Sequence, residues 1–199
     1  MYERKDALYQ RAKREGYRSR AAYKLLELQR RTHILRRGDA VVDLGAWPGG
    51  WLQVAAEHVG PRGLVLGIDV ATIEPLPLPE VRVLQADVAD ETLPVRALEV
   101  LGRPADVVLS DLAPKLTGVA PRDQAEAAAL AEHALRFAAA TLRLGGALVL
   151  KTFGGAEAEA TRSALRRSYE RVRLVALAST RKGSSELYLV ATGYRQRPG

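Results

Sequence analysis

The chain has 199 residues and a mass of 21.6 kDa, which is the size of one domain. Apolar residues make up 47% of it, enough for a sizeable core and against general disorder. It has no cysteine and only three scattered histidines, which excludes disulfides, thiolate zinc sites and iron–sulfur clusters and leaves no candidate metal site.

No apolar run approaches the roughly 18–20 residues of a membrane span, and the first residues lack the apolar core of a secretory signal. We therefore expect a cytoplasmic protein that has no membrane partner. Nothing in the sequence requires more than a monomer.

The positive charge is concentrated at the N-terminus. Residues 1–37 carry 12 basic and 4 acidic side chains, whereas residues 38–199 carry 18 basic and 19 acidic ones. Arginine outnumbers lysine 24 to 6, and its planar guanidinium suits phosphates and stacks on bases. We expect residues 1–37 to form a basic arm and helix that contacts a nucleic acid. The alternative is an arginine-rich genome and a solvated helix face.

The expected elements follow one another in a regular order. Residues 1–17 predict a partly helical or mobile arm, and residues 19–31 a helix with Ser19 at its N-cap and Ala22 and Leu25 on its buried face. Further helices are expected at 51–59, 91–101, 122–144 and 156–169, and strands at 40–44, 64–68, 81–85, 106–110, 147–150, 172–177 and 187–192.

Strands and helices alternate with the spacing of βαβ units, except that no helix separates the last two strands. This order predicts an α/β, Rossmann-like fold over residues 38–199, forming a single domain. Its sheet is expected to be seven-stranded and mostly parallel, with helices on both faces and one antiparallel strand.

A glycine-rich loop, Gly45-Ala46-Trp47-Pro48-Gly49-Gly50, follows the first strand, at the edge of the sheet where ligands bind in such folds. The GxGxxG pattern of nicotinamide-binding proteins is absent, because Trp47 stands where the second glycine is required, and there is no P-loop. A nicotinamide dehydrogenase is therefore disfavoured.

Acidic residues stand at the ends of the next two strands. Asp69 is placed to accept hydrogen bonds from ribose hydroxyls, and Asp87 from an adenine amino group. Each of them alone could equally cap a turn or a helix. A nucleoside without a phosphate-gripping loop fits this pattern better than a dinucleotide, and S-adenosylmethionine is such a ligand.

An acid and a base end the next two strands. Asp111 follows the fourth strand and Lys151 the fifth, so both are expected to face one cleft. A lysine after an apolar strand requires a partner, although Lys151 could simply emerge at the strand end and Asp111 could cap a turn. Lys24, on the first helix, and Glu186, before the last strand, are unremarkable by themselves.

Six segments, taken together, resemble the FtsJ/RrmJ (RlmE) family of RNA ribose 2′-O-methyltransferases over about residues 18–194. They are residues 18–25 (RSRAAYKL), 42–45 (VDLG), 48–51 (PGGW), 110–114 (SDLAP), 150–151 (LK) and 185–193 (SELYLVATG). The resemblance implies a catalytic tetrad of Lys24, Asp111, Lys151 and Glu186. It implies a cofactor site for S-adenosylmethionine formed by Gly49, Trp51, Asp69, Asp87 and Asp111.

The short bacterial members of this family modify a uridine in the A-loop of 23S rRNA, so the resemblance implies the large ribosomal subunit as partner. Arg18, Arg20, Arg181 and Lys182 are expected to contact RNA phosphates at the mouth of the site. A transfer RNA ribose methyltransferase and a non-catalytic RNA-binding ribosome-assembly factor stay open as alternatives.

Two points are left open. The family usually has a small residue at the position of Trp47, and a large ring there could narrow the cofactor pocket or point outward. The residues also do not decide whether Lys151 removes the proton of the 2′-hydroxyl or stabilises the oxyanion.

Overall fold

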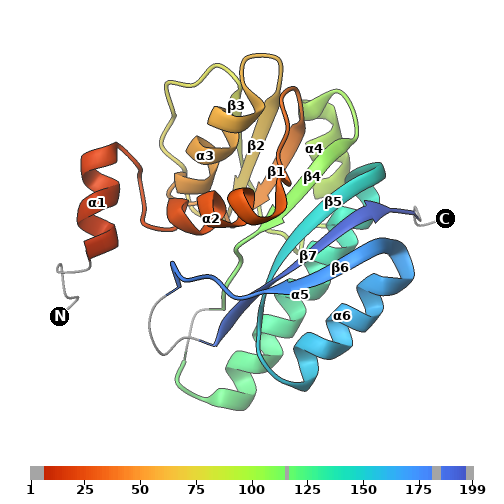
Figure 1. The fold of residues 1–199 in the computed structure, drawn as a ribbon. Coiled ribbons are helices and arrows are strands. Elements are labelled where there is room, and N and C mark those ends of the chain that lie inside the picture. The colour runs from red at the N-terminus through yellow and green to blue at the C-terminus, as the bar shows by residue number, and fades with distance from the viewer. Residues whose placement is uncertain (1–6, 115–116, 181–184, 196–199) are drawn as a thin grey trace.

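A computed structural model describes residues 7–114, 117–180 and 185–195. A central seven-stranded sheet has the order β3-β2-β1-β4-β5-β7-β6 (Figure 1). The strands are β1 (Ala40–Leu44), β2 (Leu64–Asp69), β3 (Val81–Gln85), β4 (Ala105–Ser110), β5 (Leu142–Phe153), β6 (Tyr169–Val175) and β7 (Glu186–Tyr194). The helices are α1 (Ala7–Glu15), α2 (Ala22–Thr32), α3 (Gly50–Val59), α4 (Leu93–Leu101), α5 (Ala120–Thr141) and α6 (Ala156–Ser168).

The pairing of the strands confirms the predicted topology. All pairs from β3 to β5 are parallel, whereas β7 runs antiparallel to both β5 and β6. The carboxyl ends of β1, β2, β3, β4 and β5 therefore lie along one edge of the sheet. The reversed strand β7 begins at that same edge, which brings its first residues beside the end of β5.

Two apolar clusters hold the layers together, one on each face of the sheet. Val41 of β1 points into the cluster that contains the buried residues of α2 and α3, and the next residue, Val42, points into the cluster under α4, α5 and α6. Figure 1 shows α2 and α3 in front of the sheet, with α4 and α5 behind it. The apolar residues alternate between the faces because successive side chains of a strand point to opposite sides.

Helix α1 realises part of the predicted arm. It lies beside the main body (Figure 1) and buries only Ala12. Its connection to α2 is fixed by the Tyr23 hydroxyl, which donates to Glu15 at 2.8 Å, and by an edge-to-face contact between the rings of Tyr17 and Tyr23.

The predicted N-cap of the second helix was wrong. Helix α2 starts at Ala22, and no side chain caps it. The Ser19 hydroxyl is buried instead and packs against Gly50, where an added Cβ would lie 2.4 Å from its oxygen. Ser19 thus packs closely against the first residue of α3 and does not cap α2.

The end of the long alanine-rich helix also differs from its prediction. Helix α5 stops at Thr141, and β5 begins at Leu142. Leu142 pairs with Ala105 of β4 ahead of a break in the register, and its side chain is buried. Pairing with a neighbouring strand therefore overrides a helical pattern that runs on to Leu144.

Candidate active site

A cavity of about 490 Å³ opens at the carboxyl ends of the central strands. Its size is in the range of small-molecule sites. Three of the predicted acids line it, namely Asp69, Asp87 and Asp111. The glycine-rich loop contributes Gly45 and Trp47, and the remaining wall is mainly apolar.

The loop after β1 is fixed by hydrogen bonds from its backbone. The N–H groups of Gly45 and Ala46 donate to the carbonyl of Ile68 at 2.9 and 3.2 Å. Gly45 has a φ of 80°, and a Cβ there would lie 3.1 Å from the side chain of Leu112. A glycine is thus required where this turn passes close to the segment after β4.

Asp69 and Asp87 both cap turns while lining the cavity. Asp69 accepts the N–H of Trp47 at 2.9 Å and that of Ala71 at 2.8 Å, one on each carboxylate oxygen. One oxygen of Asp87 accepts the N–H of Ala89 at 2.9 Å. The capping interpretation and the ligand interpretation of these acids are therefore compatible.

A further carboxyl group, that of Asp43, belongs to the strand that leads into the cavity. Asp43 is 1% exposed and directly precedes two cavity residues, Leu44 and Gly45. Neither of its side-chain oxygens has a hydrogen-bond partner in the described part of the chain. Burial raises the pKa of the Asp43 carboxyl well above its usual range, and the charges of Asp111 and Asp69 add to this shift. An unpaired acid at this depth suits a ligand that brings hydrogen-bond donors or positive charge.

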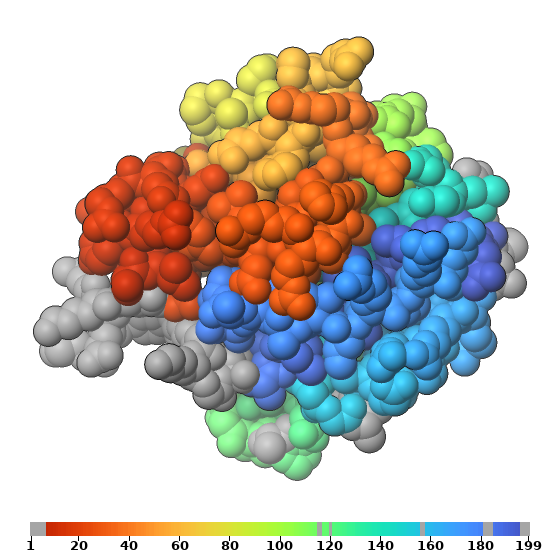
Figure 2. Space-filling model, viewed as in Figure 1, coloured from red at the N-terminus to blue at the C-terminus, as the bar shows by residue number. Residues whose placement is uncertain are grey.

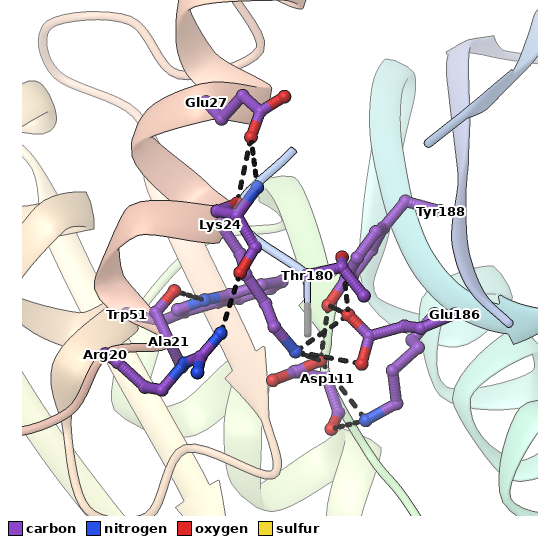
Figure 3. Close-up of polar contacts among 11 residues, drawn as sticks. Arg20, Ala21, Lys24, Glu27, Trp51, Asp111, Thr180, Glu186 and Tyr188 are labelled. Carbon is purple, nitrogen blue, oxygen red and sulfur yellow. Dashed lines mark hydrogen bonds and ion pairs between the residues drawn. The ribbon is translucent and has the colours of Figure 1, made fainter. Parts of the chain in front are cut away.

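Gly49 and Trp51, the other two predicted cofactor residues, do not line this cavity. Gly49 precedes α3 with a φ of 111°, and a Cβ there would meet the side chain of Arg18 at 3.1 Å. The indole N–H of Trp51 donates to the carbonyl of Ala21 at 2.8 Å, and its ring lies 6.0 Å from the ring of Tyr188 (Figure 3). The side chain of Trp51 therefore joins α3 to α2 and β7.

The four residues of the predicted tetrad lie close together, and Figure 3 shows three of them, Lys24, Asp111 and Glu186, pointing toward one another. The Lys24 ammonium nitrogen lies 2.7 Å from one oxygen of Glu186 and 3.9 Å from Asp111 Oδ1. Lys151 Nζ lies 3.2 Å from the same Asp111 oxygen and donates to the Asp111 carbonyl at 2.5 Å. Two cations and two anions thus form one compact network.

The fold explains how these residues meet. Asp111 directly follows β4, whereas Lys151 lies within β5 and does not follow it as predicted, because β5 runs on to Phe153. The two residues are neighbours because each comes one residue after the paired residues Ser110 and Leu150. The antiparallel register sets Phe153 opposite Glu186 and Lys151 opposite Tyr188. Helix α2 supplies Lys24. Its buried residues pack on the face of the sheet to which Tyr188 points, and this holds Lys24 beside the network.

Tyr188 is a member of this network that sequence reasoning missed. Its hydroxyl oxygen lies 2.7 Å from Asp111 Oδ1 and 2.9 Å from Glu186 Oε1. Burial, and then the negative charges of Asp111 and Glu186, raise the pKa of Tyr188, which keeps the hydroxyl protonated. The hydroxyl therefore lies within hydrogen-bond distance of both carboxylates. The sequence feature that could have revealed Tyr188 is its spacing of two residues from Glu186, because residues two apart in a strand point to the same face.

The segment after β6 is fastened to α2. Glu27 accepts the N–H groups of Ala178 and Ser179, both at 3.0 Å, and Arg31 donates to the carbonyl of Ala176 at 2.5 Å. Figure 2 shows this blue segment lying directly against the orange helix. These contacts bring the chain to the start of β7 beside Lys24.

The four basic residues predicted at the mouth have different surroundings. Arg18 donates to the carbonyls of Pro48, Glu74 and Pro75, so its guanidinium is engaged with two loops. Arg20 donates to the carbonyl of Ser179 at 3.0 Å. Arg181 and Lys182 lie outside the described residues.

The described residues contain no group of three or more histidine, aspartate or glutamate side chains arranged to hold a metal ion. Within the described ranges, no helix is long and apolar enough to cross a membrane.

Comparison with known proteins gives consistent matches. The family described as FtsJ-like methyltransferase matches residues 17–194. Ribosomal RNA large subunit methyltransferase E of Alkalilimnicola ehrlichii is 47% identical over 191 residues, 95% of this chain and 90% of its own. Its counterpart in Syntrophobacter fumaroxidans is 44% identical over 195 residues, 98% of both chains.

The fold has a solved counterpart. The crystal structure of a ribosomal RNA methyltransferase from Plasmodium falciparum matches with a TM-score of 0.79 at 27% identity, covering 91% of this chain and all of that one.

Proposed function

The chain belongs to the FtsJ-like methyltransferase family, and on that premise we propose its reaction and substrate. We propose that it transfers the methyl group of S-adenosylmethionine to the ribose 2′-oxygen of a uridine. This uridine lies in the A-loop of 23S rRNA, within the large ribosomal subunit. The observation that carries this proposal is the network of Lys24, Asp111, Lys151 and Glu186 beside a cavity lined by carboxylates. The relatives' names supply the ribosomal substrate.

The cavity residues fit this cofactor, which when bound supplies a methyl group activated by a sulfonium. Asp69 would accept the ribose hydroxyls and Asp87 the adenine amino group. The buried Asp43 carboxyl, whose oxygens have no hydrogen-bond partner in the described residues, suits a hydrogen-bond donor from the methionine end. Gly49 and Trp51 would contribute main-chain atoms, because α3 begins at Gly50 and its first N–H groups lack partners within the helix.

Lys151 is proposed to bind the ribose 2′-oxygen, which is the atom that accepts the methyl group. Its nitrogen donates to the main-chain carbonyl of Asp111 and lies beside the Asp111 carboxylate, which fixes its direction. A third N–H then remains to hold the 2′-oxygen and to stabilise the negative charge that develops on it while its proton passes to solvent and the oxygen takes the methyl group. Lys24, held by Glu186, would orient the ribose. Holding the two reactants in line can itself contribute about 7–11 kcal/mol in the best cases.

Tyr188→Phe should lower kcat for methyl transfer by about 10-fold to 100-fold, a range expected when one buried hydrogen bond to a charged group is lost. The substitution keeps the ring against Trp51 but removes the one hydroxyl between Asp111 and Glu186. Those carboxylates then move apart, and Lys24 and Lys151 move with them. Single-turnover rates with saturating cofactor measure the effect.

The control is Tyr194→Phe, because that tyrosine lies on the same strand and its hydroxyl contacts the carbonyl of Ala139, remote from the network. It should keep the wild-type rate. A normal rate for Tyr188→Phe, with cofactor affinity also normal, would remove Tyr188 from the machinery.

The basic arm and helix, residues 1–37, which include Arg20, are proposed to bind RNA phosphates together with Arg181 and Lys182. Lys13 and Arg14 are exposed in the last turn of α1, whereas the guanidinium of Arg18 is engaged with loop carbonyls. Replacing both Lys13 and Arg14 with alanine should weaken RNA binding and lower the slope of log K against log salt by about 1.4–1.8, since each phosphate contact contributes roughly 0.7–0.9.

The matched control is the alanine double variant of Arg166 and Arg167, which end another exposed helix, α6. It removes the same charge and should leave the slope unchanged. Equal slopes for the two double variants would place the RNA footprint elsewhere.

The position of the methyl group is tested with two RNA substrates. A subunit carrying 2′-deoxyuridine at the target should accept no label, whereas the ribose form is methylated. Methylation of both would move the reaction from the sugar to the base and contradict the proposed chemistry.

A further inference from the structure

Trp47 is an exposed aromatic residue at the mouth of the cofactor cavity. Tryptophan has the largest side chain of the apolar amino acids, yet Trp47 is 59% exposed. It also lines the cavity. In the described part of the chain, its indole has neither a hydrogen-bond partner nor a ring partner. The chain's other tryptophan, Trp51, is 3% exposed and has both. A solvated indole beside a site is typical of a surface that a ligand covers.

The backbone around Trp47 is held in place. Its own N–H donates to Asp69 at 2.9 Å, the preceding residues Gly45 and Ala46 donate to Ile68, and the carbonyl of the following Pro48 accepts from Arg18. The ring is therefore carried by a backbone anchored on both sides, which lowers the entropy lost when a ligand packs against it.

The surroundings of Trp47 indicate which part of the ligand is near it. The backbone N–H of Trp47 donates to Asp69, the proposed partner of the ribose hydroxyls, and the residue shares the cavity with Asp87, the proposed partner of the adenine. Lys24 and Lys151 instead gather around Asp111, where the reacting RNA ribose would lie. The backbone of Trp47 is thus tied to the acid assigned to the nucleoside, and Trp47 lines the cavity that this acid shares with Asp87.

We propose that the Trp47 indole is a binding wall for the cofactor, packing against the flat face of its adenosine. This inference rests on the proposed use of S-adenosylmethionine and names a residue that selects that ligand. The apolar neighbours of the two acids, Val70 and Val88, line the same cavity and complete its non-polar surface. Stacking is sensitive to the size of the ring and insensitive to charge, so the product and truncated nucleosides are expected to use the same wall.

The test is binding of S-adenosylhomocysteine and of 5′-methylthioadenosine, followed by calorimetry, in the full chain without RNA. Trp47→Ala should raise both dissociation constants by about 5-fold to 20-fold, as for loss of one aromatic stack, and Trp47→Phe by less. Methylthioadenosine lacks the amino-acid end, so an equal loss for both ligands assigns the contact to the adenosine. Leu144→Ala is the control, because Leu144 is 56% exposed but lies outside the cavity.

Fluorescence supplies a second readout, since the chain has only two tryptophans. Adding S-adenosylhomocysteine should change the emission of the wild type strongly and that of Trp47→Phe weakly.

Unchanged dissociation constants in Trp47→Ala would overturn the inference, and so would a weaker RNA affinity with normal cofactor binding, which would make the ring an RNA platform. A wild-type chain that binds neither nucleoside would instead overturn the proposed function itself, and with it this inference.

Discussion

Lys151→Ala should lower kcat for methyl transfer by about 100-fold to 1000-fold, the range seen when one preorganised donor to a developing oxyanion is removed. The Lys151 side chain is 5% exposed and lies between the carbonyl and the carboxylate of Asp111, so water replaces its nitrogen poorly. Affinity for S-adenosylmethionine should change by less than about 2-fold, because Lys151 does not line the cofactor cavity.

Two further variants make this result interpretable. Lys151→Met keeps the length of the side chain without its charge and should be as inactive as Lys151→Ala. Arg62→Ala removes one positive charge from the exposed turn before β2, at the opposite edge of the sheet, and should retain full activity. Near-normal turnover of Lys151→Met, at normal cofactor affinity, would contradict the assigned role.

Asp69→Ala should have the opposite profile. We expect the dissociation constant for S-adenosylmethionine to rise by about 100-fold, which corresponds to two hydrogen bonds to a charged group at roughly 1.5 kcal/mol each. The substitution removes the acceptor for the ribose and also the carboxylate that ties Trp47 and Ala71. At saturating cofactor, kcat should largely recover.

The matched control for this variant is Asp90→Ala. Asp90 also accepts a backbone N–H two residues ahead, that of Thr92 at 2.8 Å, but it does not line the cofactor cavity. Its loss should reduce stability modestly and leave cofactor affinity unchanged. Equal affinities for the Asp69 and Asp90 variants would show that the capping function of Asp69 is its whole contribution.

The part of the site built on consecutive βαβ units could be predicted from the residues alone. The apolar runs locate the strands, the parallel order brings their carboxyl ends to one edge, and the acids Asp69, Asp87 and Asp111 follow from that rule. The contact between Asp111 and Lys151 follows for the same reason, because these strands are neighbours.

The remainder depends on contacts that are distant along the chain. Lys24 and Glu186 form an ion pair across 162 residues, and nothing in the helical pattern around Lys24 distinguishes it from a solvated lysine. Only the resemblance to a known family singled it out. Packing of α2 on α3 and the Glu27 contacts to Ala178 and Ser179 create this juxtaposition, and neither has a local sequence signal.

For two further side chains, the sequence indicates the residue's character but not its contacts. Arg18 looks like a phosphate ligand in sequence, yet three backbone carbonyls surround its guanidinium. Tyr188 looks like a β-strand core residue, and it is one, yet its hydroxyl reaches the centre of the charged network. In both cases the sequence shows whether the side chain is apolar or charged, whereas tertiary structure decides which groups that side chain contacts.

The most direct test of the account is transfer of labelled methyl from S-adenosylmethionine to undermethylated large ribosomal subunits, with free 23S rRNA and bulk transfer RNA assayed in parallel. Nucleoside mapping then locates the label. We expect 2′-O-methyluridine in the A-loop of the subunit RNA and none in transfer RNA. Label confined to transfer RNA would contradict the proposed substrate, and no label in any RNA, with cofactor bound, would favour an assembly factor over an enzyme.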